Sequence, residues 1–93
     1  MSVKPISVAT LTSADNIKAS AGYLLWLNVS NASGNTLQVT VCNATSGAGS
    51  IVMQVVVLAY TSRFCNFGAG FHFGTGIRCG LLETGLTVTA GYD

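Results

Sequence analysis

The sequence predicts an all-β protein, a small antiparallel β-sandwich of jelly-roll-like architecture with seven to eight short strands. Three observations support this prediction. Apolar and polar residues alternate with a period of two in several short segments, which is typical of strands that bury one face. Residues that favour turns separate these segments at intervals of roughly 8–12 residues. No longer stretch places apolar residues at the helical spacing i, i+3, i+4, i+7.

The first part of the chain contains weak strand patterns. Residues 1–11 alternate loosely and include Pro5, which cannot donate to a strand ladder. We therefore expect an edge strand or an arm that exchanges with a neighbouring copy. A turn at residues 12–15 and a short strand at residues 17–19 follow.

The clearest strand pattern lies at residues 22–30 and 36–42, with Asn, Ser and Gly in the connection at 31–35. We interpret this pair as a β-hairpin, around which the remaining strands are organised. Alternation places Tyr23 and Leu25 on the same face as Leu27 and Val29.

The second half continues this pattern. Residues 43–50 form a polar loop that is long for a hairpin turn, so we expect it to contact another molecule. Residues 51–60 are the most continuously apolar and rich in β-branched side chains, which favours a strand. Because both its faces are apolar, this strand is either covered on both sides or meets a partner subunit with one face. We predict a short strand at 71–73 with both phenylalanines inward. The last two strands, 77–81 and 86–90, are joined by a tight turn at 83–85.

Composition predicts a single domain, residues 1–93, that does not exist alone. Hydrophobic residues make up 49% of the chain and charged residues 8%, against a typical charged share of about 25%. A chain this short buries only about 60–65% of its unfolded surface, so neighbouring subunits are expected to cover part of the apolar surplus. The residues expected at a subunit or capsid interface are Ile51, Met53, Val55, Val57, Phe64, Phe67, Phe71, Val3 and Ile6.

Charge and hydropathy argue against two classes of partner. The net charge is +1 and the four basic residues are scattered, whereas nucleic-acid binding needs clustered cations. No apolar run reaches the ~20 residues of a membrane-spanning helix, and no signal peptide is apparent. The odd number of cysteines, three, then predicts reduced thiols in a cytoplasm.

Catalytic residues are sparse. His72 is the only histidine, and Asp15, Glu83 and Asp93 are the only acids. A nucleophile–histidine–acid arrangement is arithmetically possible, but no serine lies in a G-x-S-x-G motif and His72 lies between two phenylalanines. We therefore predict a protein that is not an enzyme and needs no cofactor.

A zinc site is a weaker alternative. Cys42, Cys65, Cys79 and His72 include the donor types of tetrahedral zinc. Such sites usually contain a close C-x₂₋₄-C pair, which this sequence lacks. Buried, inert thiols are therefore the favoured interpretation.

Carbohydrate or receptor binding is the main alternative to a structural role. Tyr23 and Trp26 could line a sugar-binding face, with the polar loop at residues 43–50 beside them. For Trp26, a place in the core or at an interface is favoured over sugar binding.

Several motifs resemble those of small structural proteins of tailed phages. Residues 17–24 (IKASAGYL) fit an I-x-A-x-x-G strand that leads into an apolar strand ending at residues 27–31 (LNVSN). The resemblance resumes at residues 36–47. Residues 76–79 and 85–89, with Tyr92 following, are similar to the G-x-x-F-x-x-G-L-x-V close of those proteins.

The resemblance implies a non-enzymatic virion component. Most specifically it implies a capsid decoration (cement) protein; a head-vertex, neck, tail or fibre protein is the alternative. Such a protein would form a trimer, pentamer or hexamer and bind the major capsid protein or another virion protein. It would be made in the host cytoplasm and reside in the virion, and no catalytic residues are implied.

Overall fold

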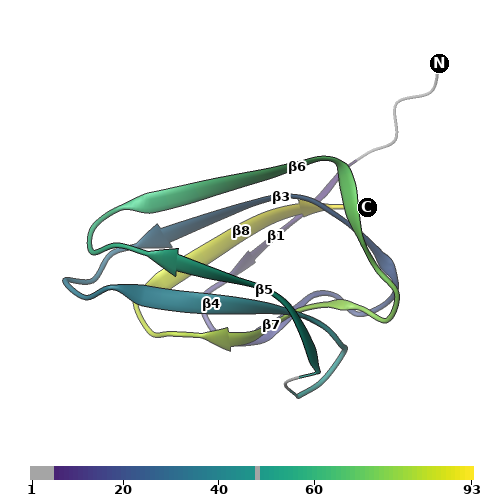
Figure 1. Ribbon diagram of the computed structural model, residues 1–93, viewed down its shortest axis with the longest axis horizontal. Helices are drawn as coiled ribbons and strands as arrows, with labels where there is room; N and C mark the ends of the chain where they lie inside the picture. The colour runs from purple at the N-terminus through teal and green to yellow at the C-terminus, as the bar shows by residue number, and fades with distance from the viewer. Residues whose placement is uncertain (1–5, 48) are drawn as a thin grey trace.

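The computed structural model describes residues 6–47 and 49–93 as eight β-strands in two antiparallel sheets (Figure 1). None of these residues forms a helix that could cross a membrane. The expected all-β sandwich is therefore confirmed. In spatial order, sheet A contains β1 (Ser7–Leu11), β8 (Leu86–Tyr92), β3 (Gly22–Asn31) and β6 (Ser62–Phe73). Sheet B contains β2 (Asp15–Lys18), β7 (Ile77–Leu82), β4 (Leu37–Asn43) and β5 (Ser50–Val57).

The strand order is that of a jelly roll. Sheet A has the order β1-β8-β3-β6 and sheet B the order β2-β7-β4-β5. Except for the link between β4 and β5, every connection carries the chain from one sheet to the other, and each sheet pairs strands from both ends of the chain. Two interlocked Greek keys of eight strands have this arrangement.

The hairpin expected at residues 22–42 is absent, because β3 and β4 belong to different sheets. The connection at residues 31–35 instead crosses the sandwich. Turn residues specify that the chain reverses, but they do not specify whether the next strand pairs beside the first or packs opposite it. Among the described strands, the only consecutive ones that pair directly are β4 and β5, and the polar loop at residues 43–50 connects them.

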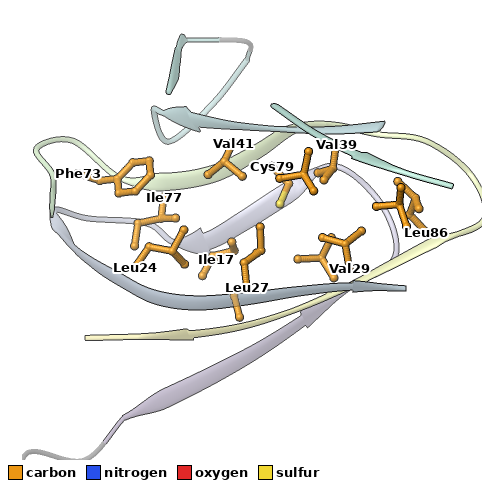
Figure 2. Packing of buried hydrophobic residues seen from close by; sticks show 14 residues of the cluster. Ile17, Leu24, Leu27, Val29, Val39, Val41, Phe73, Ile77, Cys79 and Leu86 are labelled. Atoms are coloured by element: carbon orange, nitrogen blue, oxygen red, sulfur yellow. The ribbon is translucent and has the colours of Figure 1, made fainter. Parts of the chain in front are cut away.

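The core fills the space between the sheets. Leu24, Leu27 and Val29 on β3 point toward side chains of β4 and β7 in sheet B (Figure 2). Fully burying a side chain of this size contributes roughly 1.5–3 kcal/mol relative to leaving it exposed. The buried cluster consists of Ile17, Leu24, Leu27, Val29, Val39, Val41, Val55, Val57, Phe73, Ile77, Cys79, Leu86, Val88 and Ala90.

A β-bulge in β3 changes which side chains reach this core. The register against both neighbouring strands shifts between Leu24 and Trp26: Leu25 is an extra residue relative to β8, whereas β6 has the longer stretch, residues 67–70, opposite Leu25. As a result Leu24 and Leu27 point inward, whereas Tyr23 is exposed and Trp26 is half-buried. The prediction that Tyr23 and Leu25 share one face with Leu27 is therefore wrong, because one added residue inverts the alternation of side chains.

The two apolar segments of the second half also differ from expectation. β5 ends at Val57, and the three residues after it form the turn toward β6. β6 runs without a break through the glycines at 68 and 70, where a strand interruption was expected. Phe73 is buried as expected. Phe71 pairs with the buried Leu24, but its ring is half exposed because β6 is an edge strand.

The N-terminal segment is described from Ile6 onward. β1 lies at the edge of sheet A and pairs along its whole length with β8 of the same chain. Its inward side chains, Ala9 and Leu11, pack against the core. Val3 and the rest of residues 1–5 lie outside the described residues.

Asn31 ties together the loops at one end of the sandwich. Its side chain is 4% exposed, and its Nδ2 donates to the carbonyl oxygens of Asn35, Val57 and Leu58 at 2.8, 3.0 and 3.3 Å. Its Oδ1 accepts from the backbone N–H of Ser33 at 2.9 Å. A single buried amide group therefore links backbone groups of two loops, and among its acceptors the carbonyl of Val57 is buried.

We predict that Asn31→Ala lowers the free energy of unfolding by about 1–3 kcal/mol, because the buried carbonyl of Val57 loses this donor and the link between the two loops is removed. Equilibrium urea denaturation measures this change. The matched control is Asn35→Ala in the same loop, which removes an exposed side chain and should cost less than about 0.5 kcal/mol. Equal losses in the two variants would contradict the role assigned to Asn31.

Candidate interaction surface

The described part of the chain contains no cavity or cleft that would enclose a small ligand. The four zinc-ligand candidates are also not gathered: no three His, Cys, Asp or Glu side chains come together among residues 6–47 and 49–93. Cys79 points into the core, Cys65 lies on sheet A and His72 is exposed on β6.

The outer face of sheet A carries a group of exposed aromatic side chains. The rings of Trp26 and Phe64 are stacked, with centroids 6.0 Å apart and an angle of 28° between planes. Toward the start of β3, the rings of Tyr23 and His72 are in contact, with centroids 4.9 Å apart. Val8 on β1 is exposed and occupies the same cross-strand row as Trp26. We call these five residues the aromatic face.

Gly91 makes the flat position of the Trp26 ring possible. Val8, Gly91, Trp26 and Asn66 stand opposite one another across β1, β8, β3 and β6. A Cβ atom on Gly91 would lie 2.1 Å from Nε1 of Trp26, so the indole rests directly over the glycine backbone. Glycine within a strand commonly marks such a close approach.

Polar but uncharged side chains border the aromatic face. The next cross-strand row contains Thr10, Thr89, Asn28 and Phe64. Hydroxyl and amide groups therefore lie beside the Trp26–Phe64 pair. An apolar centre with a hydrogen-bonding border is the usual organisation of a protein–protein contact surface.

The nine residues expected at an interface are found in three environments. Val55 and Val57 are buried in the core of this chain and are not available to a partner, because the bulge and register of β5 turn them inward. Met53 and Phe67 are half-buried and pack against the core. The exposed ones are Ile51, Phe64, Phe71 and Ile6, and Val3 lies outside the described residues.

Of these nine, Phe64 belongs to the aromatic face. The sequence does not indicate that Val8 and Gly91 belong to this surface. For Trp26 it favours a position in the core or at an interface. One signal in the sequence could have pointed to this site: the isolated glycine at position 91 lies inside an alternating strand, where glycine often marks a close approach to the backbone. The pairing of Trp26 with Phe64 depends on the bulge at Leu25 and is not visible in the sequence.

The loop at residues 43–50 lies away from the aromatic face. Arg78, on the outer face of sheet B, donates from Nε to the carbonyl of Gly47 at 3.0 Å. Asn16 donates from Nδ2 to the carbonyl of Thr45 at 3.0 Å and accepts from Arg78 at 3.2 Å. These bonds hold the loop beside sheet B, so the expected combination of Tyr23, Trp26 and this loop is not assembled.

The cysteines are free, and two of them are buried. Cys42 and Cys79 lie on the adjacent strands β4 and β7, and Cys79 faces Val41 in the core. The pKa of the Cys79 thiol is raised from 9.0 to about 12, first by burial and then by the neighbouring Cys42, while Arg78 partly offsets the rise. Cys79 is therefore a protonated, inert thiol at neutral pH.

Comparisons with family models, with curated proteins and with solved structures gave no match.

Replacing Gly91 with alanine should push the Trp26 ring away from sheet A. Because the new Cβ would overlap the indole, we expect a loss of about 1–3 kcal/mol in unfolding free energy. Since Trp26 is the only tryptophan, we also expect its fluorescence emission to shift to longer wavelength. The control is Gly74→Ala, where an added Cβ meets nothing within 4 Å. A G91A protein with unchanged emission and stability would show that the ring does not rest on Gly91.

The buried Cys79 thiol should make stability fall at alkaline pH. Its pKa is raised in the folded state, so above about pH 9 the unfolded chain loses a proton that the folded chain keeps. From this group the unfolding free energy then decreases by up to about 1.4 kcal/mol per pH unit, with no effect below pH 9. Urea denaturation at pH 8 to 10.5 measures the slope. Cys79→Ala should have a shallower slope, and identical slopes would refute the assignment.

Proposed function

We propose that this chain is a non-enzymatic structural protein of a virion, and that it acts as a capsid decoration protein. The observation that carries the proposal is the aromatic face: rings and an aliphatic side chain exposed together on the flat outer surface of sheet A. The resemblance to small structural proteins of tailed phages supplies the biological setting.

The exposure of apolar side chains on the aromatic face favours attachment to a partner through this face. The Phe64 side chain is 60% exposed and Val8 58%, and an aromatic side chain buries 150–250 Å² when fully covered. Exposed apolar side chains gathered on one face of a small protein are typical of a surface that a partner covers. A shell presents the same partner surface many times, so an oligomer of the chain can bind several copies of it at once, and a modest contact per copy is then sufficient.

The symmetric assembly expected for a decoration protein is part of the same proposal. Copies of the chain associate into a closed oligomer and contact the major capsid protein or another virion protein. The chain is made in the host cytoplasm with its three thiols reduced. The proposal involves no nucleic acid, membrane or cofactor.

Carbohydrate binding is the second candidate, and one observation favours it. Asn28, Asn66 and Thr89 lie around the stacked Trp26–Phe64 pair. An aromatic platform with nearby amides and hydroxyls is suited to the apolar face and the hydroxyl groups of a sugar ring. This version uses the aromatic face without the loop at residues 43–50.

The test uses shells purified from the virus whose genome encodes the chain. The wild-type protein should co-sediment with shells, and mass spectrometry should find it in the mature particles. Phe64→Ser should weaken binding at least about tenfold, equivalent to about 1.4 kcal/mol. The control is Leu58→Ser, a residue of similar exposure in the turn after β5, which should bind as wild type.

Three results would overturn the proposal. The protein could be missing from the particles, shells could fail to bind it, or both serine variants could bind equally well. If shells do not bind but neutral oligosaccharides shift the fluorescence of Trp26, the carbohydrate function is supported instead.

A further inference from the structure

Four strand edges are open in this fold, and three of them are protected against pairing with another strand. They are the edges of β1 and β6 in sheet A and of β2 and β5 in sheet B. β1 and β2 have only 5 and 4 residues, and β2 carries charges at Asp15 and Lys18. Short edge strands and edge charges are common devices that prevent sheet extension.

β6 is long, but its edge is interrupted. Between the pairs Trp26–Asn66 and Leu24–Phe71, residues 67–70 of β6 stand opposite Leu25 alone. Gly68 and Gly70 in this bulge have φ angles of 61° and 117°, which regular strands do not adopt. A neighbouring strand could not follow this edge for more than a few residues.

β5 lacks these protections. Its eight residues, Ser50–Val57, include no charged residue and no proline, and most are β-branched. A bulge at Val52 lies near its start, so that Met53–Val57 forms a regular ladder with β4. A regular, uncharged edge of this length is a template for another strand.

Two hydrogen bonds show which backbone groups of β5 face outward. The N–H of Gln38 donates to Oε1 of Glu83 on the β7 side, at 2.7 Å, rather than to its opposite residue Val56 on β5. Arg63 of β6 donates from Nη1 to the carbonyl of Val56 at 3.3 Å. Val56 therefore points its backbone groups away from β4, and by the two-residue alternation of a strand so does Gln54.

We propose that a second copy of this chain pairs with β5 in antiparallel orientation, about a two-fold axis at Gln54, to join two sheets B into one eight-stranded sheet. The proposal rests on the self-association included in the proposed function and identifies where it occurs. It does not involve the aromatic face, which remains free for the shell.

The edge is complementary to itself. Around a two-fold axis, the outward N–H and C=O of Gln54 meet the C=O and N–H of Gln54 in the second copy. In this register regular pairing covers Met53–Val55 of both copies, and Val56 lies next to the bulged residue Val52 of the second copy, so apolar side chains meet without like charges. The side-chain amides of the two Gln54 residues, which each bond Gln38 in their own chain, flank the axis with both donors and acceptors.

Arg63 is the group that competes with this pairing. Its guanidinium occupies the carbonyl of Val56, which the second copy also needs. Arg63 is exposed, so it can leave this carbonyl without disturbing the core. Removal of its guanidinium should therefore tighten the dimer rather than weaken it.

Sedimentation velocity over a range of concentrations tests the proposal. Wild type should form a dimer, and Arg63→Ala should lower the dimer dissociation constant several-fold. Gln54→Pro should be monomeric, because it removes an outward N–H and no bond to β4. Gln54→Lys should also be monomeric, since two ammonium groups would meet at the axis. Thr10→Lys, at an exposed site on β1, should dimerise as wild type; circular dichroism confirms that each variant is folded.

The outcomes separate this inference from the proposed function. Loss of the dimer in folded Gln54→Lys with shell binding through Phe64 retained supports both. A wild-type protein that stays monomeric to about 100 μM, or an oligomer that Phe64→Ser dissociates and the Gln54 variants do not, overturns pairing through β5. Dimerisation that depends on Gln54, in a protein that binds no shell, supports the β5 interface and contradicts the decoration role.

Discussion

The packing of β3 against sheet B is the constraint on which the rest of the structure depends. β3 is the central strand of sheet A that pairs with both β8 and β6, and its inward residues Leu24, Leu27 and Val29 are completely buried. The bulge at Leu25 allows Leu24 and Leu27 to point inward together although three positions separate them. The same bulge turns Trp26 outward, where it meets Phe64 and covers Gly91. The extra residue in β3 therefore determines both which side chains of this strand enter the core and which lie on the aromatic face.

The ends of the sandwich are held by asparagines rather than by apolar contacts. Asn31 joins the loops at one end, and at the other end Oδ1 of Asn43 accepts from the N–H groups of Thr75 and Gly76 at 2.8 and 3.3 Å. A jelly roll needs many crossings between its sheets, and each crossing exposes backbone groups that the ladders cannot satisfy. Short amide side chains satisfy these groups without adding charge.

The distribution of apolar side chains connects this architecture with the proposed function. After the core is filled, large hydrophobic side chains remain on the outer face of sheet A and beside the edge of β5. The two locations differ in the contact they favour. A flat face with aromatic rings and a polar border suits a partner with its own side-chain surface, whereas a regular edge suits the backbone of another strand. In the proposed decoration role, the first contact would join the chain to its shell and the second would join it to its copies.

The sequence alone determined the all-β class, the approximate ranges of most strands, the tight turn at residues 83–85 and the surplus of apolar side chains. These properties follow from local periodicity and residue type, which act over a few neighbouring positions. Three further features required the tertiary structure: the placement of β3 and β4 in different sheets, the inward position of Val55 and Val57, and the pairing of Trp26 with Phe64 over Gly91. Each depends on register between strands distant in the chain, and one bulge is enough to invert it. Local patterns contain no information about such pairing, because the free energy that selects it comes from burial between sheets.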